Sequence, residues 1–246
     1  MKQNKESRGL SHPVIFDNLG SLPETQLHAE SVDILIAGSD TTAFSVSLSI
    51  YHILNNPVIK SRLTDCLFKL IPEASQMPRL AQLEECPYLF ACVKESLRVA
   101  TAVPSMLPRI VPDPKKVKGA EPLIIDGQLI PPGTIVGMGA HTMHNSTELW
   151  GQDVHVFKPE RWLDGDGTVG TNAKTLEQWL CTFSKGVRQC IGINFAHAEM
   201  FVLFAVLFRQ FDMELPGNFS MPKLRDLFAQ QIEAPGLLVK CKPRSK

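Results

Sequence analysis

Apolar and polar residues alternate with a helical period over much of the chain. One long helix is expected from Ser21, where Ser21 and Glu24 form a capping box, to the stop signal Asn55-Asn56-Pro57. About 34 residues of helix span roughly 50 Å, so this element is expected to cross a whole domain. Further helices are expected at 58–71, at 87–99 and after Gly192, the last being apolar nearly all round and therefore buried.

The strand signals are few and short. Residues 123–125 and 128–130 flank Asp126-Gly127, which predicts a hairpin with a primed turn. Single strands are expected at 134–136 and 237–239. No regular alternation of strands and helices is present, so the predicted fold class is mainly α (α+β), with small β-hairpins.

The middle of the long helix contains weak helix formers. Residues 37–42 read A-G-S-D-T-T, which places a glycine and two β-branched threonines where strong helix formers are expected. Either an ordinary glycine and threonine kink or a local distortion at a functional site accounts for this pattern.

Composition excludes several classes of protein. Of 246 residues, 44% are apolar and 20% charged, so wholesale disorder is excluded. Lysine plus arginine and aspartate plus glutamate each number 25, which argues against a nucleic-acid binder. The six cysteines are sparse and form no C-x-x-C pair, which favours a reduced, intracellular protein.

No targeting segment is evident. Met1 is followed by polar residues and not by the apolar stretch of a signal peptide. The longest apolar run, 200–208, is about half of the ~20 residues that a membrane-spanning helix needs. We therefore expect no membrane anchor in this chain.

The most informative segment ends at Gly192 and reads F-S-K-G-V-R-Q-C-I-G. Cys190 directly precedes a predicted helix, whose N-terminal dipole and unpaired N–H groups favour a thiolate. Gly186 permits a sharp turn, and Gly192 leaves room for a flat ligand. Phe183 can shield the sulfur from water, and Arg188 can reach a carboxylate of the ligand. A single cysteine is more often a buried structural residue, but the complete pattern indicates an axial ligand of haem iron.

This segment resembles the cysteine-ligand loop of the cytochrome P-450 family, the haem-thiolate monooxygenases, and fungal members in particular. The similarity continues through I-N-F-A to Ala196 and Glu199. It implies haem b as cofactor, with Cys190 as the thiolate ligand of its iron. It also implies that residues 1–246 form a partial domain, the C-terminal half of the family's fold, without the N-terminal half and its membrane anchor.

The weak stretch of the long helix is similar to the family's oxygen-activation motif. The resemblance implies that Gly38 lets dioxygen approach the backbone, that Thr41 offers it a hydroxyl, and that Asp40 belongs to the proton-delivery path.

Two further motifs follow in the family's order. Glu95 and Arg98 match E-x-x-R, a spacing that places both on one helix face but is also common in solvated ion pairs. Residues 159–162 read P-E-R-W and supply Arg161. By resemblance, Glu95, Arg98 and Arg161 form a buried ion triad that fixes the loop carrying Cys190, specifying geometry more than adding stability.

The segment after the E-x-x-R helix passes over the haem in this family. The resemblance implies that Arg109 binds a haem propionate and that Val103 and Met106 contact substrate, although Arg109 also fits a surface arginine. His141 and His144 do not complete a metal site, because no further ligand stands at a suitable spacing, and a structural role is expected for His144.

The family resemblance implies a haem-thiolate monooxygenase. It inserts one atom of O2 into an apolar small molecule, with electrons from an NADPH-cytochrome reductase because no dinucleotide-binding fingerprint is present. Fungal secondary metabolism is the expected setting, and the endoplasmic reticulum membrane the expected location of a full-length parent. The alternatives are a truncated, non-catalytic haem-binding remnant and a haem-thiolate isomerase or peroxide-using enzyme.

Overall fold

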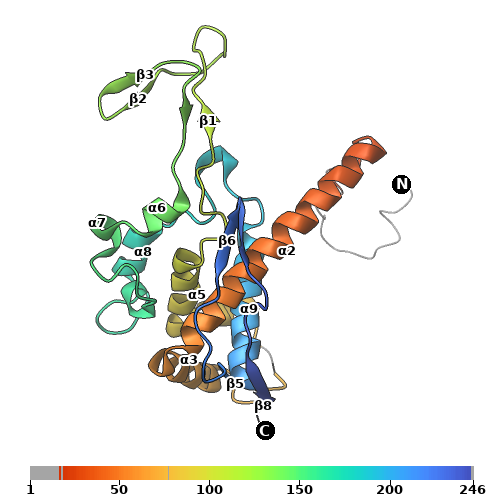
Figure 1. Cartoon of the computed structure of the whole chain (residues 1–246), viewed down its shortest axis with the longest axis vertical. Helices are drawn as coiled ribbons and strands as arrows, with labels where there is room; N and C mark the ends of the chain where they lie inside the picture. Colours follow the sequence, from red (N-terminus) through yellow and green to blue (C-terminus); the bar gives the residue numbers. More distant parts are fainter. Residues whose placement is uncertain (1–16, 18, 77, 245–246) are drawn as a thin grey trace. The chain divides into compact units, whose positions relative to one another are not determined.

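The computed structural model describes residues 17, 19–76 and 78–244 (Figure 1). The chain divides into two compact units, residues 1–40 and 41–246, and each is described by itself. Helix α2 (Glu24–Leu54) begins in the first unit and continues into the second.

Helix α2 is regular along its whole length. It begins at Glu24, directly after Pro23 and not at Ser21, and continues without interruption to Leu54. The expected distortion within residues 37–42 is therefore absent. Glycine and threonine lower helix propensity but, unlike proline, leave every backbone hydrogen bond in place. The Ser39 hydroxyl also donates to the carbonyl oxygen of Leu35 over 2.7 Å, within the helix.

Three helices form the body of the second unit. Helices α3 (Pro57–Leu70), α5 (Pro87–Val99) and α9 (Ile193–Gln210) contact one another pairwise, and the short α4 (Leu80–Glu84) packs against α5 and α9 (Figure 1). Each long helix lies within one residue of its predicted position. Asn56 caps α3 by accepting hydrogen bonds from two backbone N–H groups of the first turn, as expected for an asparagine at this position.

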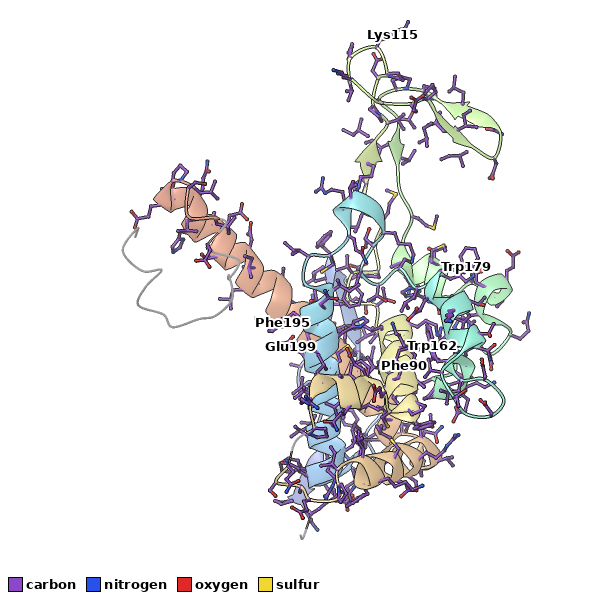
Figure 2. The ribbon with its side chains drawn as sticks, turned by 180° about the vertical axis from the view of Figure 1, so that it is seen from behind. Phe90, Lys115, Trp162, Trp179, Phe195 and Glu199 are labelled. Carbon is purple, nitrogen blue, oxygen red and sulfur yellow. The ribbon has the colours of Figure 1, made fainter. Side chains whose placement is uncertain are left out.

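The core consists mainly of apolar side chains from these helices and from the end of α2, and buried side chains such as Trp150, Trp162 and Met213 complete it. Its fully buried members include Ile53, Leu63, Leu67, Leu89, Val93, Phe204 and Phe208. Helix α9 is not buried all round, contrary to the prediction. Phe195, labelled on α9 in Figure 2, is 67% exposed, because α3, α4 and α5 cover α9 only in part.

Four antiparallel strand pairs complete the second unit. They are β1 (Arg109–Ile110) with β4 (Ile135–Val136), β2 (Leu123–Ile125) with β3 (Gln128–Ile130), β5 (Phe211–Glu214) with β8 (Lys240–Pro243), and β6 (Leu224–Leu227) with β7 (Ala229–Ile232). The predicted hairpin is confirmed as β2–β3, and both turn residues have positive φ (49° at Asp126 and 77° at Gly127), as a primed turn requires.

The predicted strand at 237–239 is wrong. The strand begins at Lys240, which pairs with Glu214 at the end of β5, so residues 237–239 have no partner strand there. Overall, helices with small strand pairs confirm the predicted mainly α fold class.

Short helices that the sequence did not predict connect the strands to the helical body. They are α6 (Ala140–His144), α7 (Thr147–Trp150), η1 (Pro159–Trp162), α8 (Thr171–Glu177) and η2 (Gly186–Arg188). Elements of three to seven residues are too short to show a helical period. They matter here because several of them carry groups that contact Glu95 and Arg98 of α5.

Within the described part of the chain, α2 alone is long and apolar enough to cross a membrane by length and composition. The expectation of no such segment considered only uninterrupted apolar runs, and α2 mixes its apolar residues with polar ones. A core helix of a globular protein meets the same criteria, so this finding does not assign α2 to a membrane.

Candidate functional site

Glu95 is the centre of an extensive polar cluster. It lies on α5, is completely buried, and uses both carboxylate oxygens. Arg98, one turn along the same helix, donates from Nε to Oε2 over 3.0 Å and from Nη2 to Oε1 over 2.7 Å. This two-point ion pair is the geometry in which arginine binds a carboxylate most strongly.

The P-E-R-W segment, folded as η1, and Lys158 directly before it supply three more donors to Glu95. Arg161 donates from Nε to Oε1 over 3.1 Å, and the backbone N–H of Lys158 donates to the same oxygen over 2.9 Å. The indole N–H of Trp162 donates to Oε2 over 2.9 Å. The buried carboxylate is thus fully hydrogen-bonded, which offsets its desolvation. Trp162 is labelled in Figure 2.

The two arginines extend this cluster to neighbouring loops. Arg98 also donates to the carbonyl oxygen of His144 over 3.0 Å. Arg161 donates to the carbonyl oxygen of Trp150 over 2.9 Å and to Asp153 Oδ1 over 3.2 Å. The Glu95 cluster therefore joins α5, α6, α7 and η1 into one unit.

The loop before α9 turns tightly. The backbone N–H of Cys190 donates to the carbonyl oxygen of Phe183 over 2.9 Å, which closes the loop on itself. Within it, Ser184 and Gly186 have positive φ values of 60° and 76°. A side chain at Gly186 would meet no atom within 4 Å, so the backbone conformation and not space requires glycine there.

Cys190 is a free, exposed cysteine ahead of the N-terminus of α9. A Cβ atom at Gly192, the residue before that helix, would lie 3.8 Å from the Cys190 sulfur, so glycine keeps this side of the sulfur open. The apolar side chains of Val187 and Ile191 on either side are almost completely exposed. An open sulfur near a helix N-terminus, flanked by apolar side chains, fits the thiolate ligand of a flat, apolar cofactor.

Phe183 lies beneath this loop. Its ring centroid is 5.2 Å from that of His197 on α9, and it packs against the hydrophobic core. Lys94 of α5 forms an ion pair with Glu177 of α8 over 2.6 Å, and Lys185 donates to the Glu177 carbonyl oxygen over 3.2 Å. The loop is thereby attached to both α8 and α9.

The structure does not bring all the predicted residues together. Arg109 is exposed on β1 and donates to the Pro108 carbonyl oxygen over 2.9 Å. Arg188 is exposed on η2, within the cysteine loop. Gly38 and Asp40 belong to the first unit, whereas Thr41 belongs to the second with Cys190. The roles expected for these residues stay predictions.

Sequence reasoning missed several groups that complete the site. Asp153, the second carboxylate that binds Arg161, follows no motif and was not identified. Lys94 directly precedes Glu95, but a helix sequence alone does not reveal its partner on α8. The one available signal was Trp162, because a polar N–H on a buried aromatic residue requires a hydrogen-bond acceptor.

The partly buried His52 and the completely buried His144 give the fold a pH dependence. The pKa of His52 and of His144 is lowered from 6.5 to about 4, mainly by burial. The charge of Arg98 contributes to both shifts, whereas the charge of Glu95 opposes the shift at His52. The unfolded chain therefore takes up protons at a higher pH than the folded chain. Above pH ~6.5 both side chains are neutral in either state, so the free energy of unfolding is expected to decrease only as the pH falls from there toward ~4.

By pH 5 the decrease is at most about 2 kcal/mol per histidine. Urea unfolding at several pH values measures it, and His52→Asn should reduce the slope. An unfolding free energy that is constant between pH 7 and 5 would contradict this prediction.

Comparison with known proteins agrees with this site. The family model described as Cytochrome P450 matches residues 5–238. The chain belongs to the cytochrome P450 family. It is 37% identical over 199 residues to "Cytochrome P450 monooxygenase macH" of Penicillium terrestre, which covers 80% of this chain. It is 33% identical over 243 residues, 94% of the chain, to "N-acetyltryptophan 6-hydroxylase ivoC" of Emericella nidulans.

The P450 match contains every motif from Gly38 to Gly192. A third relative, "Cytochrome P450 monooxygenase MO6277" of Ascocoryne sarcoides, is 35% identical over 85% of the chain. The chain spans 37%, 39% and 45% of the lengths of macH, MO6277 and ivoC, respectively. The predicted family, including its fungal character, is confirmed.

Proposed function

We propose that this P450 chain takes part in a haem-thiolate monooxygenase reaction that hydroxylates or epoxidises an apolar small molecule. The observation that carries the proposal is the free, exposed sulfur of Cys190 on a loop closed by its own backbone. The relatives that carry the name monooxygenase support it.

Cys190 would hold haem b through its iron, and when bound this group supplies the oxygen-activating redox chemistry. Gly186 gives the loop its turn, and Gly192 leaves the approach to the sulfur open. We assign Arg109 and Arg188 to the haem carboxylates, since both are exposed arginines and a guanidinium group binds a carboxylate well.

Residues of α2 would give dioxygen access and deliver protons to it. Gly38 presents a helix surface without a side chain, and a Cβ there would meet no atom within 4 Å. Asp40 and Thr41 supply a carboxylate and a hydroxyl, the groups through which protons can reach a reacting oxygen. Electrons would come from an NADPH-cytochrome reductase, and fungal secondary metabolism is the proposed setting. For a longer parent protein we propose the endoplasmic reticulum membrane as its location.

Turnover assays test this proposal. The chain is reconstituted with haem and supplied with NADPH, cytochrome reductase, O2 and a panel of apolar substrates, and oxygenated product is measured. Product that requires both reductase and O2 is expected, and Thr41→Val should reduce it. Bound haem without product would favour the non-catalytic alternative, and product formed from peroxide alone, without reductase, would favour the peroxide-using alternative.

A further inference from the structure

His144 connects two parts of the molecule that are far apart in sequence. It lies at the end of α6, is completely buried, and has both ring nitrogens within hydrogen-bonding distance of a partner. The backbone N–H of Cys181 donates to Nε2 over 3.0 Å. On the other side of the ring, Nδ1 lies 2.9 Å from the hydroxyl oxygen of Thr101, which follows α5.

The direction of these hydrogen bonds is fixed. Because a backbone N–H can only donate, Nε2 of His144 carries no proton, and Nδ1 carries the single proton of a neutral ring. Nδ1 then donates to the Thr101 oxygen, and the Thr101 hydroxyl donates to the carbonyl oxygen of Arg98 over 3.0 Å. A directed chain of hydrogen bonds thus runs from Cys181 to the last turn of α5.

The surroundings hold the ring neutral and in place. Burial lowers its pKa to about 4, and the charges of Arg98 on α5 and Lys185 on the loop act in the same direction. His141 is the other titratable side chain of α6 that acts on it. The edge of the ring meets Trp150, with the ring centroids 6.2 Å apart at 89°. Arg98 donates to the His144 carbonyl oxygen, so the backbone is fixed as well.

Cys181 begins the segment that leads to Cys190. The next residue, Thr182, donates from its hydroxyl to the carbonyl oxygen of Leu97 on α5 over 2.7 Å. The residue after that, Phe183, accepts the backbone N–H of Cys190 through its carbonyl oxygen over 2.9 Å. Three consecutive residues therefore transmit the position of α5 to the backbone of Cys190.

We propose that His144 is a positioning residue for the cysteine loop, acting through the backbone N–H of Cys181 to place Cys190 for iron ligation. The role of His144 in haem binding rests on the proposed function, whereas its effect on the position of the loop does not. It assigns His144 a task beyond filling the core.

Two variants separate this task from simple packing. In His144→Gln the side-chain amide oxygen reaches the former place of Nε2 and can still accept from Cys181. In His144→Asn the amide reaches only the place of Nδ1, so it keeps a group near Thr101 and loses the acceptor for Cys181. Both variants are neutral and polar, but asparagine leaves a larger cavity than glutamine at this buried position. A packing role would therefore speed exchange at core amides in general, whereas loss of the acceptor acts on the Cys181 amide.

Hydrogen exchange in the haem-free chain is the first measurement. The Cys181 amide should exchange roughly tenfold faster in His144→Asn than in His144→Gln, because only the former loses its acceptor. After haem reconstitution, His144→Asn should also show a smaller thiolate-type fraction in the reduced, carbon-monoxide-bound absorption spectrum, at equal helix content by circular dichroism.

The outcomes separate the two proposals. Equal Cys181 exchange in both variants overturns the positioning role, as does an unchanged thiolate fraction in His144→Asn when the wild-type chain shows thiolate ligation. If the wild-type chain shows no thiolate ligation, the proposed function fails, and the exchange experiment still decides whether His144 holds the loop.

Discussion

Replacing Glu95 by alanine is expected to destabilise the chain by about 3–5 kcal/mol and to abolish haem retention. The substitution leaves the guanidinium groups of Arg98 and Arg161 buried without their carboxylate, and it leaves the indole N–H of Trp162 without an acceptor. The loss is larger than for an exposed ion pair, because water cannot replace the missing charge at a completely buried position.

Urea unfolding and a haem titration measure these two effects. Glu84→Ala is the matched control, because Glu84 is an exposed glutamate on the neighbouring helix α4 and its removal should change stability by less than about 0.5 kcal/mol. Full haem content and unchanged stability in the Glu95 variant would contradict the assigned role of the Glu95 cluster.

Cys190→Ser is expected to leave the fold intact and remove thiolate ligation. Cys190 is exposed and its sulfur is not part of the hydrophobic core, so urea unfolding of the haem-free chain should be nearly unchanged. A serine hydroxyl does not ionise near neutral pH, so it offers iron no anionic sulfur. A haem titration should therefore show weaker retention of haem.

Cys241→Ser is the control for this experiment, because Cys241 is also an exposed, free cysteine but lies on β8. It should bind haem like the wild-type chain. Equal losses of haem in both variants would indicate that no single cysteine is the ligand.

The sequence predicts the long elements well because their signals repeat over many residues. Helices α2, α3, α5 and α9 each contain several turns of periodic apolar residues, and Asp126-Gly127 marks a turn that few other dipeptides allow. The short helices α6 and α7 contain too few residues for a periodic signal.

Likewise, part of the site is predicted by sequence motifs and part is not. The E-x-x-R and P-E-R-W motifs identify residues that bind Glu95. In the structure the hydrogen bonds from Arg161 and Trp162 to Glu95 span 66 and 67 positions of the sequence. Asp153 and the hydrogen bonds of His144 depend on how loops pack against α5, which no local pattern encodes. In α2, by contrast, the sequence predicted a feature that the structure lacks. Weak helix propensity over residues 37–42 predicted a distortion, but the backbone hydrogen bonds keep the helix regular.

The central claim is that Cys190 provides a thiolate to haem iron. Its most direct test is the absorption spectrum of the haem-reconstituted chain, reduced and saturated with carbon monoxide, recorded beside Cys190→Ser. We predict a strongly red-shifted Soret band for the wild-type chain that is absent from the variant. A band typical of a nitrogen or neutral ligand in the wild-type chain, or the same band in both proteins, would contradict the account.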